Sequence, residues 1–328
     1  MLAPSLQSLG YLPISTVTLC AATDLDFDLY IQHEGRSFAE LYRGRSYPLT
    51  NDDLERLRTS GVDHLYIRWD DKDSYRSFLK ENVLSDRCVP LAARIRALKE
   101  VTRVAFEDAL RRNNCDKMVH VAGDFGRDLA GMLADDTPAF QEMFKALDHD
   151  YYTFTHACNV STYCALIAVR TGNCDAVEVA EIAAGGILHD IGKRHIPVQI
   201  LNKSRGLTDQ EWVLMRQHPV TGYKELASRG DLSEGQLMMV YQHHERLDGS
   251  GYPDGIRGDK MHPWGKICAV ADVFDALSSR RPYRGAVPLA TVTSYLRRFA
   301  NVQFDAEAVH CLTGAFSDEL IGAATAGV

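Results

Sequence analysis

Hydrophobic and polar residues alternate over 25–31, where leucine, phenylalanine and isoleucine occupy every second position. This is the period of a half-buried β-strand. Further extended runs are predicted at 11–22, 38–42 and 64–69. A short helix is predicted over 52–60, since Thr50 can cap its start and Gly61 can stop it. Residues 1–85 are therefore predicted to form a small α+β domain, for which a regulatory or interaction role is the hypothesis.

The pattern becomes helical after about residue 86. Apolar residues recur three or four positions apart over 91–109, which makes one apolar stripe on a helix. More helices are predicted at 117–133 and 138–147, and the helical pattern continues from 151 to the end, with turn-rich loops at 192–206 and 248–263. We therefore predict a mainly α protein, with a helical connecting segment at 86–149 and a helical domain at 150–328.

Composition and charge exclude some functions. The 328 residues include 36 Lys and Arg against 44 Asp and Glu, a net charge of −8. Without a basic excess, binding to long nucleic acid is not expected. No apolar run is long enough to cross a membrane. No Lys or Arg precedes Arg36, so the basic start of a secretory signal is not found. The eight cysteines form no CxxC pair, so we expect reduced thiols and a cytoplasmic location.

Five histidines and two aspartates are candidate metal ligands, because each group lies on, or at the end of, a different predicted helix. They are His156, His189, Asp190, His218, His243, His244 and Asp272. His218 is predicted to lie late in a helix capped by Thr208. Imidazole and carboxylate together suit divalent Fe, Mn, Ni, Co or Zn. A lone helical histidine is more often a surface or packing residue, so the argument rests on the whole set. Asp190, adjacent to His189, is the natural carboxylate to bridge two metals.

Four segments resemble motifs of the HD superfamily, and specifically of its HD-GYP branch. They are HDIGKRHIPVQILNKSRGLTDQEW, QHP, HHERLDGSGYPDGIRG and VADVFDALSSRRPYR, and they occur in that family's order and spacing. The namesake tripeptide is Gly251-Tyr252-Pro253. The resemblance runs over 151–316, about half the chain. It implies an HD-type helical bundle in which the seven candidates bind divalent metal ions, Fe or Mn before Ni, Co or Zn.

The resemblance also implies an enzyme and its substrate. The implied activity is hydrolysis of the bacterial second messenger cyclic di-GMP to 5′-pGpG, by a hydroxide that bridges two metals. Asp190 and Lys193 are the implied catalytic residues, and Lys193 would contact a phosphate; the plainer interpretation of Lys193 is a cation at a helix C-terminus. The implied substrate-binding residues are Lys193, Tyr252, Asp275, Arg281 and Arg284.

One position departs from the family pattern. Members with three metals carry a glutamate four residues before the first histidine of the site, and Tyr152 stands there in this chain. Because tyrosine is a poor ligand at neutral pH, we predict a site with two metals. Whether pGpG is cut further to GMP stays open.

Two alternatives differ in kind from this interpretation. One is a low-activity cyclic di-GMP sensor or adaptor. The other is an HD phosphohydrolase that acts on another cyclic dinucleotide, such as 3′3′-cGAMP. Two partners stay open: a GGDEF-domain protein that docks on the GYP loop, and a second copy of the chain in a homodimer. No membrane partner is expected. The first 85 residues resemble an uncharacterised region that precedes some HD-GYP domains.

Overall fold

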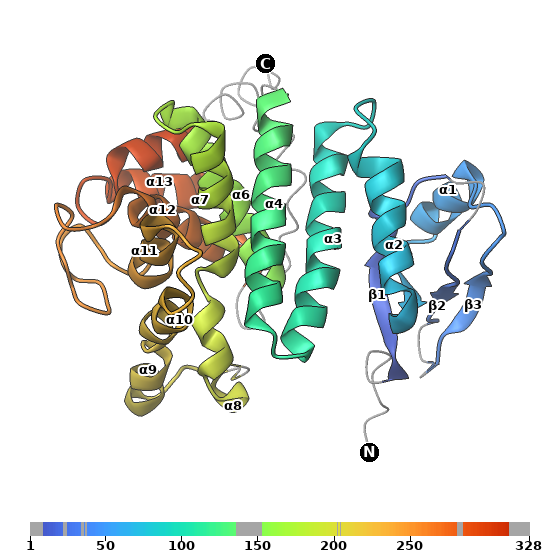
Figure 1. Ribbon diagram of the computed structural model, residues 1–328, viewed down its shortest axis with the longest axis horizontal. Helices are drawn as coiled ribbons and strands as arrows, with labels where there is room; N and C mark the ends of the chain where they lie inside the picture. The colour runs from blue at the N-terminus through green and yellow to red at the C-terminus, as the bar shows by residue number, and fades with distance from the viewer. Residues whose placement is uncertain are drawn as a thin grey trace. The chain divides into compact units, whose positions relative to one another are not determined.

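The computed structural model describes residues 9–21, 25–33, 36, 38–135, 153–201, 203, 205–280 and 285–314. The chain divides into two compact units, Met1–Arg111 and Arg112–Val328 (Figure 1). The helical stretch that was predicted as a connecting segment is shared between them, because its first long helix belongs to the first unit and its second to the second unit.

In its described residues, the first unit combines a four-stranded antiparallel sheet with three α-helices. The strand order is β1-β4-β2-β3. The strands are β1 (Tyr11–Ser15), β2 (Leu29–Ile31), β3 (Glu40–Arg43) and β4 (His64–Arg68). The helices are α1 (Asn51–Thr59), α2 (Lys72–Leu79) and α3 (Leu91–Arg111). Short helical turns lie at Thr16–Thr18, Trp69–Asp71 and Lys80–Leu84. The strands and the helices α1 and α2 lie within the residues predicted as a small α+β domain, and α3 extends the unit beyond residue 85.

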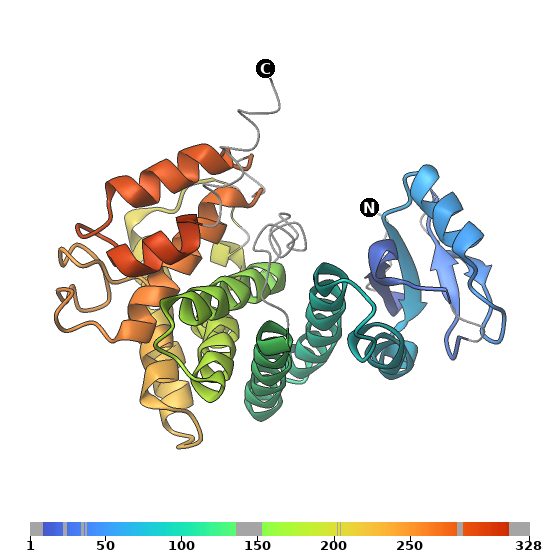
Figure 2. The same cartoon turned by 90° about the horizontal axis from the view of Figure 1, so that it is seen from above.

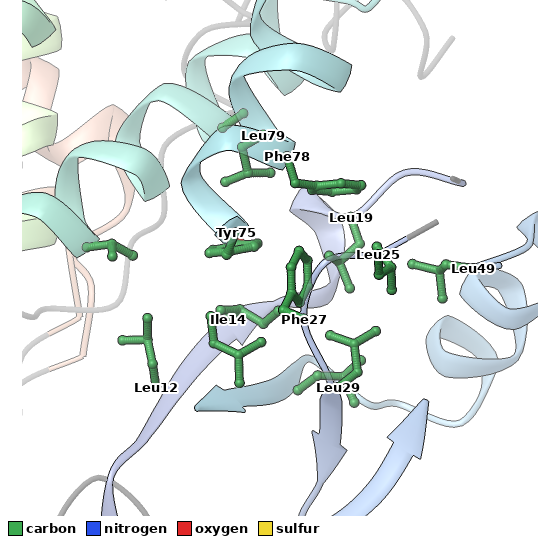
Figure 3. Packing of buried hydrophobic residues seen from close by; sticks show 14 of the residues in the cluster. Leu12, Ile14, Leu19, Leu25, Phe27, Leu29, Leu49, Tyr75, Phe78 and Leu79 are labelled. Atoms are coloured by element: carbon green, nitrogen blue, oxygen red, sulfur yellow. The ribbon is translucent and has the colours of Figure 1, made fainter. Parts of the chain in front are cut away.

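One face of the sheet packs against α2 to form the core of this unit (Figure 3). Ile14 of β1 faces inward, as the strand alternation requires. The ring of Phe27 meets the rings of Tyr75 and Phe78 edge to face, with centroids 5.6 and 5.7 Å apart. The Tyr75 hydroxyl shares a hydrogen bond of 2.9 Å with the hydroxyl of Thr18, so its polar tip is satisfied inside the core.

The helix caps and strand patterns in the sequence of this unit match the structure, with small shifts in the bounds of the elements. Helix α1 begins with a capping box, in which Thr50 Oγ1 accepts from the Asp53 amide and Asp53 accepts from the Thr50 amide. Gly61 follows it with φ +68°. The alternating run at 25–31 contributes only β2, although Leu25 and Phe27 are buried as predicted. Helix α2 was not predicted.

The second unit is a bundle of helices. They are α4 (Cys115–Asp135), α6 (Thr153–Thr171), α7 (Ala176–Leu188), α8 (Val198–Leu201), α9 (Asp209–Met215), α10 (His218–Ala227), α11 (Glu234–Gln242), α12 (Pro263–Ser278) and α13 (Leu289–Arg298), with a 3₁₀ turn at Ile191–His195. Helix α7 contacts α4, α6 and α11, and α12 contacts α6 and α11 (Figures 1 and 2). The predicted mainly α fold is confirmed. The helix predicted at 138–147 lies outside the described residues. None of the helices described has the length and apolar content to cross a bilayer.

The prediction that His218 lies late in a helix capped by Thr208 is wrong in one respect. Thr208 does cap α9, but α9 ends at Met215 and His218 is the first residue of α10. The cause is Pro219, which has no amide hydrogen and whose ring would clash with the carbonyl of Met215 inside a continuous helix. Proline is favourable in the first turn of a helix, so a new helix starts at His218.

Close packing of α4 on α7 depends on Gly126, because a Cβ there would collide with the carbonyl oxygen of Ala180. We expect Gly126→Ala to lower the free energy of unfolding by about 1–3 kcal/mol, since backbone cannot move aside as a side chain can. Urea denaturation followed by circular dichroism measures it. Gly131→Ala in the same helix is the matched control. No heavy atom of the described residues lies within 4 Å of that Cβ, so it is expected to be neutral or stabilising. Equal effects would contradict the packing argument.

Candidate metal centre

The seven predicted ligands come from five helices of the second unit. His156 lies on α6, His189 caps the C-terminus of α7 and Asp190 follows it. His218 opens α10, His243 and His244 follow α11, and Asp272 lies on α12. All are buried except His244, which is partly exposed. The fold thus collects side chains that are up to 116 positions apart in the sequence, from 156 to 272.

The ligand atoms form two adjoining groups. One group is His156, His189 and Asp272, and the other is Asp190, His218, His243 and His244. Within each group, one atom from every residue lies within 4.8 Å of the others. Asp190 reaches both groups, because Oδ2 lies 3.3 Å from His189 Nε2 and Oδ1 lies 3.2 Å from His218 Nε2. Its position between the groups is the one that a bridging carboxylate would need.

Backbone carbonyl groups orient three of the imidazole rings. In His189, His218 and His243, Nδ1 faces the carbonyl oxygen of the residue three positions earlier, at 2.7, 2.8 and 2.9 Å. A carbonyl can only accept, so these Nδ1 atoms carry the proton and Nε2 keeps its lone pair. The Nε2 atoms lie near Asp190. Such orientation by a second hydrogen bond is typical of histidines that bind metal.

Asp275 orients the fourth ring. Its Oδ2 accepts from Nδ1 of His156 at 2.7 Å, and its Oδ1 accepts from Asn159 at 2.8 Å and from Ser279 at 3.1 Å. Asp275 was predicted to contact the substrate. The structure places it fully buried behind His156, with both carboxylate oxygens engaged. Asn159 was not singled out in the sequence, although its place three residues after His156 puts it on the same helix face.

Burial and neighbouring charges shift the pKa values of several groups in the centre in opposite directions. Burial disfavours a charged imidazole, but hydrogen bonds to Asp272 and Asp275 outweigh it and raise the pKa of His156 to about 9. Burial and the neighbouring imidazoles lower the pKa of His243 to about 4. Burial would raise the pKa of Asp190, yet Lys193 and His189 hold it well below its usual value. The centre therefore combines an ionised carboxylate, Asp190, with one imidazole whose protonated form is favoured, His156, and one whose protonated form is disfavoured, His243.

Two buried polar atoms in this cluster have no hydrogen-bond partner among the residues that the structure describes: Nε2 of His189 and Oδ1 of Asp190. An unpaired buried polar atom is costly and needs an explanation. Both atoms are lone-pair donors that face the other ligands, so a divalent cation would satisfy them. The residues present therefore fit a metal ion, and the donor set of imidazole nitrogen and carboxylate oxygen suits iron, manganese or zinc.

The GYP loop lies against the centre. The ring of Tyr252 packs on that of His244, with centroids 4.6 Å apart. Gly251 has no room for a Cβ beside Cα of Glu245. Glu245 is fully buried, and its Oε1 accepts from the amides of Asp254 and Gly255 at 2.8 and 3.1 Å, which anchors the loop. Sequence reasoning missed Glu245; a charged residue directly after two ligands was the available signal.

The remaining predicted residues divide into two sets. Nζ of Lys193 lies 2.5 Å from Oδ2 of Asp190, and its side chain is 22% exposed, so it stands between the centre and solvent. Arg281 and Arg284 lie outside the described residues, as does Tyr152, so their predicted roles stay predictions.

The second unit is therefore a helical domain whose clustered histidine and aspartate side chains suit metal ions. Comparison with known families agrees: the HD domain family matches residues 129–308. The chain belongs to this HD domain family, whose members bind divalent metals, and the predicted kinship with its HD-GYP branch is confirmed. The solved structure of Bd1817, an HDG"Y"P protein from Bdellovibrio bacteriovorus, has a similar fold, with a TM-score of 0.68 at 20% identity, over 94% of this chain and 99% of that one.

Several curated relatives are similar in sequence. The cyclic di-GMP phosphodiesterase PA4108 of Pseudomonas aeruginosa is 30% identical over 83% of this chain and 69% of its own length. The response regulator RpfG of Xanthomonas campestris, a cyclic di-GMP phosphodiesterase, is 39% identical over 47% of this chain and 40% of its own. The 3′3′-cGAMP-specific phosphodiesterase 1 of Vibrio cholerae is 36% identical over 44% and 33%. The chain thus spans less than half of the latter two relatives.

Because Asp275 orients His156, we expect Asp275→Ala to weaken metal binding by about 10–100-fold. Titration of the metal-free protein with Mn²⁺, followed by calorimetry, measures the affinity, and circular dichroism checks that the variant folds. Asp254→Ala is the matched control. That carboxylate bonds only the exposed Tyr241 hydroxyl among the described side chains, and should leave the affinity unchanged. Unaltered Mn²⁺ affinity in a folded Asp275→Ala protein would contradict the orienting role.

Proposed function

We propose that this protein is a metal-dependent phosphodiesterase that hydrolyses cyclic di-GMP to 5′-pGpG and so lowers the level of this second messenger. The observation that carries the proposal is the pair of adjoining ligand groups with Asp190 between them. Two metal ions are part of the proposal, with Fe or Mn preferred. Relatives named cyclic di-GMP phosphodiesterase support the substrate.

The chemistry proposed for the centre follows from its residues. His156, His189 and Asp272 would hold one cation, His218, His243 and His244 the other, and Asp190 both. Divalent ions held in this way supply Lewis acidity toward a phosphodiester and lower the pKa of water. The Nδ1 hydrogen bonds keep the rings in place, so little reorganisation is needed when the ions and substrate bind.

Residues at the edge of the centre are proposed to handle the substrate. Lys193 would exchange its contact with Asp190 for a non-bridging phosphate oxygen, where its charge offsets the charge that develops during hydrolysis. Tyr252, held beside His244, offers a ring face and a hydroxyl to the nucleotide. Arg281 and Arg284 keep their predicted role in binding phosphate or guanine.

Two other functions use the same centre. Relatives named for 3′3′-cGAMP are 33–40% identical over 40–51% of this chain, so that dinucleotide is a second candidate substrate. A sensor that binds cyclic di-GMP without turnover is the other. A cytoplasmic location is proposed as well, supported by eight cysteines that are all free thiols.

The deciding experiment is turnover and metal content measured on one sample. Protein purified without oxygen and reloaded with Fe²⁺ or Mn²⁺ is expected to hold about two metals per chain and to convert cyclic di-GMP to pGpG. Faster turnover of 3′3′-cGAMP would shift the substrate within the same chemistry. Bound metal and tight cyclic di-GMP binding without product would favour the sensor. A protein that binds no metal would refute the ligand assignment.

Asp190→Ala is expected to lose metal and activity together. With no carboxylate between the two groups, we expect turnover to fall by about 10³-fold or more, because both ions lose a shared ligand. Elemental analysis and product chromatography measure the two effects. Asp209→Ala, at the exposed start of α9, is the control and should behave as wild type. Full activity in a correctly folded Asp190→Ala protein would contradict the proposed mechanism.

A further inference from the structure

Arg216 is an exposed arginine next to the metal centre, and none of the described residues gives it an acidic partner. It follows α9 directly and stands two residues before His218. Within the part of the chain that the structure describes, no carboxylate lies within 4.0 Å of its guanidinium, and it makes no side-chain hydrogen bond. Two other arginines of this unit do have an acidic partner: Arg194 lies 2.8 Å from Glu225, and Arg229 lies 2.7 Å from Asp231.

Aromatic rings hold Arg216 instead. Its Cζ lies 5.4 Å from the centroid of Tyr252 and 5.9 Å from that of Trp212. Contacts of this kind place a cation against ring faces and leave the edge N–H groups of the guanidinium unused. A planar fork of free donors, with restricted motion, matches the two oxygens of a phosphate.

The position of Arg216 links it to the reaction. The Tyr252 ring that it contacts packs in turn on His244, 4.6 Å away between centroids. Arg216, Tyr252 and His244 therefore form consecutive contacts from solvent to the metal centre. Lys193, another cation near Tyr252, is bonded to Asp190 and stands at the centre itself. Arg216 is thus a positive charge at the rim, one ring removed from the ligands.

A cyclic dinucleotide carries two phosphodiesters, and only one can lie at the metals during hydrolysis. The second is an anion that must be held beyond the ligand cluster. We propose that Arg216, held by Tyr252 and Trp212, binds this second, non-scissile phosphate and so selects dinucleotides over diesters with a single phosphate. The inference rests on the proposed function and adds a substrate-binding residue to it.

The test compares two substrates and two variants. Arg216→Met keeps length and packing but removes the charge. Arg298→Met is the matched control, because Arg298 also stacks on an aromatic ring, Phe299 at 5.7 Å, but lies at the end of α13. KM and kcat are measured on Mn²⁺-loaded protein with cyclic di-GMP and with bis(p-nitrophenyl) phosphate, which has one phosphate.

For Arg216→Met, we expect the KM for cyclic di-GMP to rise about 10–100-fold, the loss typical of a charged hydrogen bond. Hydrolysis of bis(p-nitrophenyl) phosphate should change far less, and Arg298→Met should match wild type on both substrates. Arg216→Lys should recover part of the loss. Equal losses on the two substrates would mean that Arg216 acts on the metal centre, and a wild-type KM in Arg216→Met would mean that it only packs. Either result overturns the proposal.

Equilibrium binding separates this inference from the proposed function. Fluorescent cyclic di-GMP is titrated into wild type and Arg216→Met, with cyclic di-AMP as competitor. Weaker binding of both nucleotides by the variant supports the phosphate contact even if wild type shows no turnover, in which case only the proposed function fails. A loss confined to the guanine ligand would assign Arg216 to the base and overturn the phosphate contact. Wild type that binds neither nucleotide overturns both proposals.

Discussion

A buried carboxylate among imidazoles is the interaction on which the second unit depends. Asp190 is ionised inside the bundle, 3.2 Å from His218 and 3.3 Å from His189. Burying a charge without full compensation is costly, and Oδ1 of Asp190 has no hydrogen-bond partner among the described residues. Five helices must therefore place their ligands around one point, and the ends of α7 and α11 and the start of α10 meet there.

The shell around the ligands makes this arrangement rigid. Backbone carbonyls orient three histidines, and Asp275, itself held by Asn159 and Ser279, orients His156. Glu245 does the same for the GYP loop by accepting from two amides in it. The adjacent residues His244 and Glu245 thus connect the metal centre to the GYP loop, which would contact the nucleotide. The centre and the loop are therefore coupled through the backbone at these two residues.

In the proposed reaction, the metal ligands and the residues around them, such as Tyr252 and Arg216, have different roles. A pair of divalent ions would act on any phosphodiester, so the ligand cluster alone does not discriminate between nucleotides. The chain is similar to relatives named for cyclic di-GMP and to others named for 3′3′-cGAMP. Selectivity would come from residues around the cluster, where Tyr252 and Arg216 stand. The first unit has its own core, built on Phe27 and Tyr75.

Local patterns determined what lies within a turn or two along the chain: the Thr50 and Thr208 caps, the long helices α3 and α4, and the residue types that bind metal. Only the tertiary structure decided which side chains meet. It placed Asp275 behind His156, buried Glu245 and set Asp190 between two ligand groups. The physical reason is that these contacts join helices up to 119 residues apart, and no period in the sequence encodes such pairs. His218 falls between these two cases. Pro219 is visible in the sequence, but only the structure shows that it starts a new helix at His218 and changes the direction of this predicted ligand.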